Sequence, residues 1–164
     1  MYKDIVVIPK SPYHYHNENP KGRKTDDCVI RAIATATGQT WDDTLRGLTE
    51  CAIKHKYMIN CPSLYDKYLK ELGWVKQKQP KRSDNKRYRA CEFVKKFNGI
   101  AIANLGAQHV ACIKYGQVWD IWDSSNEVVG NYWVKKCWNC TKKCNKILVK
   151  FAFTRAKLWC IIKA

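Results

Sequence analysis

The stretch Thr25-Asp26-Asp27-Cys28-Val29-Ile30-Arg31-Ala32-Ile33-Ala34 marks the point at which a polar loop ends and an apolar helix begins. Apolar residues recur at helical spacing after Cys28, and Gly38 is suited to end the helix in a left-handed conformation. We therefore predict a helix over 28–37 with Cys28 in its first turn. The unpaired N–H groups of a helix N-terminus favour an anion, so they would lower the pKa of a thiol placed there.

A histidine and two carboxylates follow about eighty residues later, in a predicted hairpin over 109–123 with Gly116 in its turn. A histidine beside Cys28 would accept its proton and pass it to a leaving group, and a third residue would orient the imidazole. With this turn, residues whose numbers sum to about 232 face each other, which places His109 opposite Asp123. Asp120 would point to the opposite face of a regular strand. The predicted catalytic residues are Cys28, His109 and Asp123, with Asp120 as the alternative third member.

This order of a helix-leading cysteine, a strand-leading histidine and an Asp or Asn on the next strand resembles the papain-like cysteine peptidase superfamily, including its C39-like and NlpC/P60-like groups. Asp27–Ile33 and Ile121–Ser124 are also similar to small proteins of phages and Gram-positive bacteria. The resemblance covers roughly residues 13–125. It implies an α+β fold in which helices, with the nucleophile at a helix N-terminus, pack on a C-terminal antiparallel sheet. It also implies hydrolysis of a peptide or isopeptide bond through an acyl-enzyme.

One position departs from the papain-like pattern. These enzymes usually carry a glutamine for the oxyanion hole six residues before the cysteine, and Gly22 stands there in this chain. The nearest upstream carboxamides belong to Asn19 and Asn17, in the polar loop 11–27. We expect these side chains, with the backbone N–H of Cys28, to form the oxyanion hole. Gln108 adjoins His109 and is a candidate substrate contact.

Length and composition limit the class of protein. A chain of 164 residues with 46% hydrophobic residues is expected to form one domain over 1–164, with a helical half at about 28–97 and a sheet half at about 99–164. The sequence contains no run of about 18 apolar residues, so no transmembrane helix is expected. The first residues lack the pattern of a signal peptide, so we expect a cytoplasmic protein, in the host cytoplasm if phage-encoded. The nine cysteines are then expected to be reduced.

Local signals place the other elements. Thr40 is a candidate N-cap with a carboxylate three residues later, and Pro62 and Gly73 bracket a further helix. The predicted helices after the first lie at 41–56, 62–72 and 90–97. The predicted strands outside the hairpin lie at 4–8, 100–103, 147–153 and 158–162.

The chain is strongly basic, with a formal net charge of +16. Residues 76–89 contain seven Lys and Arg with one Asp, and residues 135–150 contain six Lys and no acid. Either segment could hold a polyanion or acidic partner, or could be a solvated loop. The alternative function is therefore a non-enzymatic basic module that binds nucleic acid or a host protein on a papain-like scaffold. The sequence does not indicate an oligomeric state.

Metal-ligand patterns in the chain are incomplete. Cys137 and Cys140 have the spacing of half a zinc knuckle, and Cys144 and Cys160 could complete a structural zinc site. The second pair lacks the usual spacing, so a basic hairpin with free cysteines is the favoured interpretation and no cofactor is expected. His14 and His16 have a His-x-His spacing without a third ligand nearby, which favours a polar loop.

Overall fold

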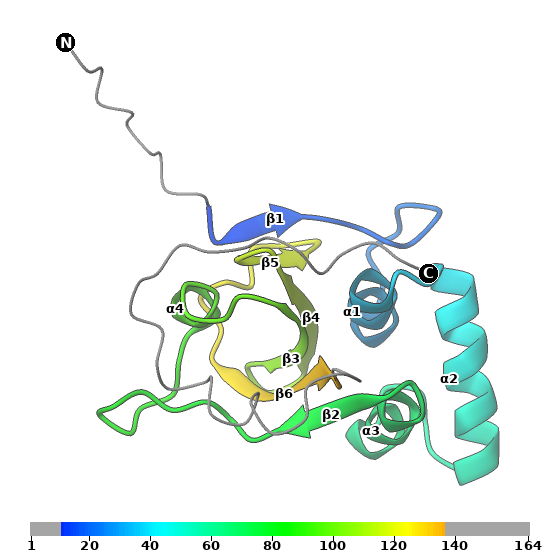
Figure 1. Ribbon diagram of the computed structural model, residues 1–164. Coiled ribbons are helices and arrows are strands. Elements are labelled where there is room, and N and C mark those ends of the chain that lie inside the picture. The colour runs from blue at the N-terminus through cyan, green and yellow to red at the C-terminus, as the bar shows by residue number, and fades with distance from the viewer. Residues whose placement is uncertain (1–10, 137–164) are drawn as a thin grey trace, which may run out of the picture.

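The computed structural model describes residues 11–136, so the predicted strands at 4–8, 147–153 and 158–162 lie outside the described residues. Within that range, four helices and a six-stranded mixed sheet form an α+β structure (Figure 1). The predicted α+β class is confirmed. No helix between residues 11 and 136 is long and apolar enough to cross a bilayer.

The first three helices begin and end where local sequence signals place them. Helix α1 spans Cys28–Thr37, and Gly38 ends it with a φ of 77°. Helix α2 spans Trp41–His55, and the Thr40 hydroxyl accepts the N–H of Asp43 at 3.0 Å, as the predicted cap requires. Helix α3 spans Pro62–Glu71 with proline in its first turn, and the short α4 spans Ala90–Phe93. The predicted helix at 90–97 is thus shorter than expected.

The sheet has the strand order β1-β5-β4-β3-β6-β2. Only the β1–β5 pair is parallel; the other pairs are antiparallel. The strands are β1 (Tyr13–Tyr15), β2 (Trp74–Gln77), β3 (Ile100–Leu105), β4 (His109–Lys114), β5 (Gln117–Asp120) and β6 (Val129–Lys135).

Three of these strands differ from the prediction. β1 lies in the predicted polar loop, β2 lies within the predicted helical half, and β6 was not predicted. Short strands carry little local signal, and these three form because distant partners supply their backbone hydrogen bonds. Tyr13 pairs with Val118, and Trp74 pairs with Lys135. The helical and sheet halves are therefore not separate in sequence.

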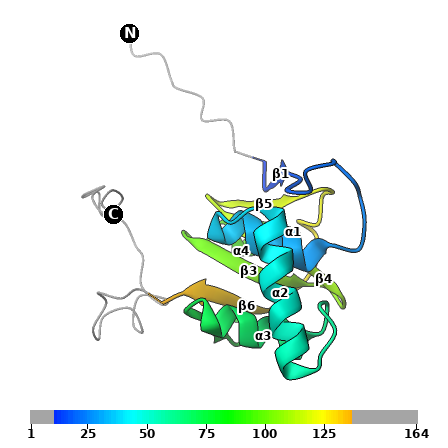
Figure 2. The ribbon, with the colours of Figure 1, turned by 90° about the vertical axis from the view of Figure 1, so that its right-hand side faces the viewer.

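The strongly curved sheet separates two hydrophobic cores. Helices α1, α2 and α3 pack on one side, and α4 packs on the other (Figures 1 and 2). Ile33 of α1 and Leu48 of α2 are fully buried in the first core. The α4 side is lined with small residues, Ala101, Ala103 and Ala111, which leave room for the inside of the curve. Burial of α1 against β4 fixes the position of Cys28 relative to the sheet.

The β4–β5 hairpin has a different register from the predicted one. Its turn contains two residues, Tyr115 with a φ of 54° and Gly116 with a φ of 75°. Lys114 therefore pairs with Gln117, and residue numbers of facing pairs sum to 231 instead of 232. A shift of one residue moves every side chain of a strand to the other face. This shift determines which aspartate shares a face with His109.

Close packing between α2 and α3 can be tested at Gly47. A Cβ there would lie 2.5 Å from the hydroxyl of Tyr68 and 2.8 Å from its ring. Alanine has a better helix propensity than glycine by about 1 kcal/mol. We nevertheless expect Gly47→Ala to lower the free energy of unfolding by about 1–3 kcal/mol in urea titrations, because the buried ring must move. In a Tyr68→Leu background the same change should be neutral or stabilising. Equal losses in both backgrounds would contradict this packing.

Candidate active site

Cys28 is the first residue of α1, and Asp27 before it organises the start of the helix. The Asp27 carboxylate is buried; it forms an ion pair with Arg31 and accepts hydrogen bonds from Asn19 Nδ2 at 3.0 Å and Trp41 Nε1 at 2.9 Å. It makes no side-chain cap bond to the first turn. The N–H groups of that turn therefore remain available to an anion on Cys28.

His109 at the start of β4 contacts the carboxylate of Asp120 at the end of β5. His109 Nε2 donates to Asp120 Oδ2 at 2.5 Å. Ser124 Oγ donates to the same oxygen at 2.6 Å, and the N–H of Ile121 donates to Asp120 Oδ1 at 2.8 Å. The Asp120 side chain is only 3% exposed, so these three donors compensate for its lost hydration. The His109 ring is thereby fixed with Nδ1 left for the Cys28 thiol.

The carboxylate that contacts His109 is therefore Asp120, the predicted alternative, and not Asp123, the first choice. The two-residue turn places Asp120 opposite Ala111, on the strand face that it shares with His109. Asp123 follows the end of β5, is exposed, and accepts the backbone N–H of Ser125 at 3.0 Å. The prediction assumed that Gly116 alone formed the turn. In the structure Tyr115 also lies in the turn, with a positive φ that a non-glycine residue seldom adopts.

The Cys28 and His109 side chains shift each other's pKa in opposite directions. Burial alone would raise the pKa of the Cys28 thiol, but hydrogen bonds from His109 and from the backbone N–H groups of Val110 and Val29, with the charge on His109, lower it overall. Burial also opposes a charge on His109. Hydrogen bonds to Asp120 and Cys28 and their negative charges nevertheless raise its pKa to about 9. Both shifts favour the form of the pair in which Cys28 is a thiolate and His109 is an imidazolium.

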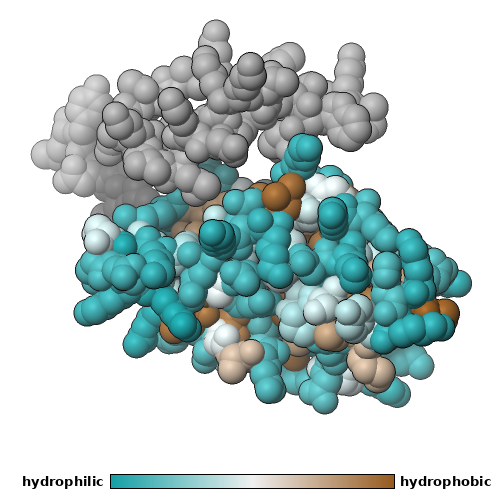
Figure 3. All heavy atoms as spheres, turned by 90° about the horizontal axis from the view of Figure 1, so that it is seen from below, coloured by the Kyte–Doolittle hydropathy of each residue, from teal (hydrophilic) through white to brown (hydrophobic). Residues whose placement is uncertain are grey.

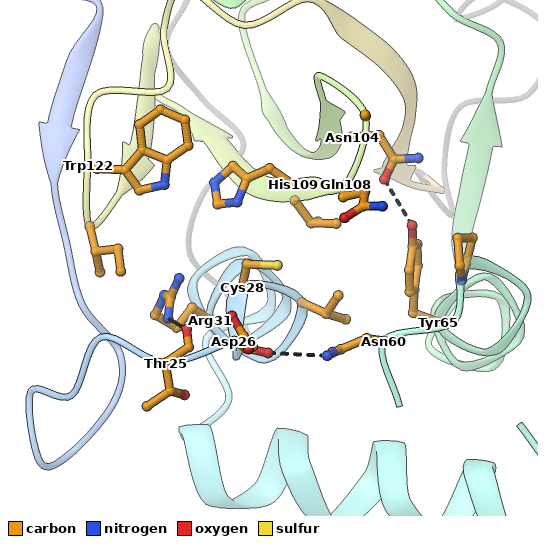
Figure 4. A pocket seen from close by; sticks show the side chains of 15 residues that line it. Thr25, Asp26, Cys28, Arg31, Asn60, Tyr65, Asn104, Gln108, His109 and Trp122 are labelled. Carbon is orange, nitrogen blue, oxygen red and sulfur yellow. Dashed lines mark hydrogen bonds between the residues drawn. The ribbon is translucent and has the colours of Figure 1, made fainter. Parts of the chain in front are cut away.

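The pair opens into a pocket of about 750 Å³ between α1, the start of α3 and the start of β4 (Figure 4). On one side the Trp122 indole lies over His109, with ring centroids 5.1 Å apart and the indole 44% exposed. The other side contains Tyr65, whose hydroxyl donates to Asn104 Oδ1 at 3.0 Å. The thiol is therefore accessible, whereas the His109–Asp120 contact is shielded from water.

The predicted oxyanion donors Asn17 and Asn19 do not line this pocket. Asn17 Nδ2 donates to the carbonyl of Arg23 at 3.2 Å, and Asn19 Nδ2 donates to Asp27. Gly22 follows both of them, in a turn where it has a φ of 63°. These carboxamides stabilise the loop before Cys28, so this prediction is corrected; the backbone N–H of Cys28 remains a candidate donor.

Sequence analysis missed several polar groups of the pocket. Ser124 was noted only as part of a motif, although it donates to Asp120. Tyr65, Asn60 and Asn104 also line the pocket and were not singled out. Of the polar residues in the pocket besides Cys28 and His109, only Gln108 could be predicted from the sequence, because it adjoins His109.

The possible metal ligands fall into separate groups. Cys137, Cys140, Cys144 and Cys160 lie outside the described residues. Among residues 11–136, ligand atoms of Cys51, His55 and Glu71 lie within 4.8 Å of one another, but Lys54 Nζ already binds Glu71 at 3.1 Å. His14 and His16 pack against Trp119 with ring centroids 4.0 and 5.1 Å away, so aromatic packing accounts for their spacing.

Comparison with known proteins assigns no family. No protein-family model, no curated protein and no solved structure matches the chain. The function must therefore be argued from the geometry of the site itself.

Substitution of the two aspartates distinguishes their roles. Asp120→Asn should lower the pKa of His109 by removing its negative partner, and thereby raise the pKa of Cys28. We expect the rate of iodoacetamide labelling of Cys28 at pH about 6 to fall by roughly tenfold, as for one unit of thiol pKa. Asp123→Asn is the matched control and should label like the wild type. A loss in Asp123→Asn with none in Asp120→Asn would contradict the assignment.

Proposed function

We propose that this protein is a cysteine-dependent acyl hydrolase of papain-like type, acting on a peptide or isopeptide bond. The observation that carries the proposal is the chain of contacts from Asp120 through His109 to a thiol at a helix N-terminus. Each member has the chemical role that thiol acyl transfer requires: an activated nucleophile, a proton carrier and an orienting carboxylate.

In the first half of the reaction, the Cys28 thiolate attacks the carbonyl carbon of the bound substrate. The electron pair of the C=O bond moves to oxygen, and the tetrahedral intermediate collapses when His109 Nδ1 gives its proton to the leaving amine. Asp120 stays ionised and stabilises the imidazolium through Nε2. The acyl group is then held as a thioester on Cys28.

In the second half, neutral His109 accepts a proton from water as the water oxygen attacks the thioester carbon. The intermediate expels the Cys28 thiolate and releases a carboxylic acid, which regenerates the ion pair. Because His109 serves the leaving group, the amine portion of the substrate lies on the Trp122 side and the acyl portion lies toward Tyr65 (Figure 4).

The pH dependence of the thiol tests this proposal. The lowered pKa of Cys28 predicts iodoacetamide labelling that persists below the range of an ordinary thiol, whereas His109→Ala should shift labelling to higher pH by about one unit or more. Amide hydrolysis should decline above about pH 9, where His109 loses the proton needed by the leaving group. Alkylation should not decline there, because it needs only the thiolate.

Two controls sharpen the measurement. Cys28→Ala identifies labelling of the other thiols, and mass spectrometry assigns the modified peptide. Slow labelling of Cys28 with an ordinary thiol profile, unaffected by His109→Ala, would contradict the proposal.

The basic segment 76–89 favours a second candidate function, the binding of a polyanion. Residues 78–89, here called the basic hairpin, form a turn instead of the predicted loop without regular structure: Lys81 and Arg87 make an antiparallel bridge on either side of Asn85.

The ion pairs leave most of the positive charge of this segment uncompensated. Lys76 pairs with Asp66, and Arg82 pairs with Asp84 and Glu92. Among the ion pairs of residues 11–136, the other five cations of the segment have no acidic partner: Lys78, Lys81, Lys86, Arg87 and Arg89. The lower face of the molecule is largely hydrophilic (Figure 3).

A salt series tests the second candidate. If the basic hairpin binds phosphates, the affinity for a fluorescent single-stranded oligonucleotide should fall with salt, with a log–log slope of about −0.7 per contact. Removing Lys81, Lys86 and Arg87 together by alanine substitution should make the slope less steep by up to about 2. The same change in net charge on the α2–α3 side, at Lys56, Lys67 and Lys70, is the control. Equal effects of both triple variants would indicate non-specific attraction by net charge alone.

A further inference from the structure

We propose that Gln108 supplies the side-chain donor to the oxyanion that forms during acylation of Cys28. This inference rests on the proposed acyl hydrolase function and assigns a catalytic residue to it. The donor would come from the β3–β4 connection instead of the loop before the nucleophile, so this chain would build its oxyanion hole from the histidine side of the site.

The loop before Cys28 cannot supply this donor in the described conformation. Position 22 is a glycine with a φ of 63°, and its N–H donates to the carbonyl of Asn19 at 2.8 Å. Glutamine would be strained in that backbone conformation. Asn17 and Asn19 already hold the loop together through their own side-chain hydrogen bonds. A tetrahedral intermediate at Cys28 must therefore find its second donor elsewhere.

The pocket contains three carboxamides, and two of them are engaged. Asn60 Nδ2 donates to the carbonyl of Asp26 at 3.2 Å. Asn104 accepts from Tyr65, and in Figure 4 its nitrogen points away from Cys28. No hydrogen bond joins Gln108 to the other residues drawn in Figure 4, and its side chain lies between His109 and the Tyr65–Asn104 pair. Within residues 11–136 its N–H groups have no acceptor, so they can meet a new acceptor beside the thiol.

The backbone of Gln108 is anchored on both sides, so the side chain starts from a fixed point. The turn begins at Gly106, which has a φ of 61° and donates its N–H to the carbonyl of Val128 at 2.9 Å. It closes where His109 pairs with Leu105 across the β3–β4 ladder. Gln108 directly precedes the histidine that serves the leaving group. An amide here lies on the opposite side of His109 from Trp122, away from the proposed place of the leaving group, so it can donate to the carbonyl oxygen.

The chemical role can be followed with p-nitrophenyl acetate, a small ester probe. The Cys28 thiolate forms an S–C bond to the ester carbon, and the C=O electron pair moves onto oxygen. Gln108 Nε2 and the backbone N–H of Cys28 donate to this oxyanion. When the C=O bond re-forms, p-nitrophenolate leaves with the electron pair of the broken C–O bond, and acetyl-Cys28 remains. Alkylation by iodoacetamide also consumes the thiolate but forms no oxyanion.

The test compares these two reactions at the same sulfur in the full chain. We expect Gln108→Ala to slow acetylation of Cys28 by at least about tenfold and to leave the iodoacetamide rate within about twofold of the wild type. Gln108→Glu keeps the size of the side chain but loses the N–H donors, and should be at least as slow in acetylation. Asn17→Ala, which removes a carboxamide that does not line the pocket, is the matched control and should change neither rate by more than about twofold.

The outcomes distinguish failure of the Gln108 assignment from failure of the proposed hydrolase function. Normal alkylation with normal acetylation in Gln108→Ala would overturn the assignment of Gln108 and leave the proposed hydrolase intact. Equal losses in both reactions would also overturn it, because Gln108 would then act on the thiolate itself. Slow alkylation of Cys28 in the wild type would instead refute the proposed function. Circular dichroism of each variant confirms that the exposed substitution leaves the fold unchanged.

Discussion

The buried carboxylate of Asp27 is the constraint on which the candidate site depends. A buried charge is costly unless it is paired and hydrogen-bonded. Its partners come from the loop before α1, from α1 itself and from the start of α2: Asn19, Arg31 and Trp41. Satisfying this one charge therefore brings three segments together at the residue next to Cys28. The position of Cys28 follows from the need to compensate a carboxylate that does not itself line the pocket.

A second series of opposite charges, formed by Asp120, His109 and Cys28, leads toward the pocket. Asp120 accepts a hydrogen bond from His109, His109 lowers the pKa of the Cys28 thiol, and the first turn of α1 has no side-chain cap bond from Asp27. If Asp27 capped that turn instead, its side chain would take the N–H groups that favour the thiolate. Ser124 and Ile121 fix Asp120 from behind, so the ring of His109 cannot turn away without leaving a buried carboxylate short of donors. Each group is thus stabilised by the next one along the series.

Local signals in the sequence predicted the first three helices and the starting positions of Cys28 on a helix and His109 on a strand, but not the pairing of distant strands. The end of α1 at Gly38 and the cap at Thr40 depend on neighbouring residues, so a single sequence shows them. The choice between Asp120 and Asp123 depended on whether Tyr115 takes a left-handed conformation, which local propensity argues against. The role of Asn19 depended on a contact with Asp27, and the role of Asn17 depended on a contact with the carbonyl of Arg23. No spacing rule reveals either contact. Register and tertiary hydrogen bonds were therefore the limits of the prediction.

Cys112 provides an internal comparison that favours a functional role for Cys28. Both are cysteines packed near the same sheet, and a thiol in a protein core is usually only a small apolar group. Burial raises the pKa of Cys112 to about 12, as expected for such a residue. Cys28 is also partly buried, yet His109 and nearby backbone N–H groups reverse the effect of burial and lower its pKa. Core packing alone gives no reason to place a carboxylate, an imidazole and a helix N-terminus in line with one thiol beside an open pocket. The selective pattern of charge, more than the presence of any single residue type, is what distinguishes a reactive cysteine from a structural one.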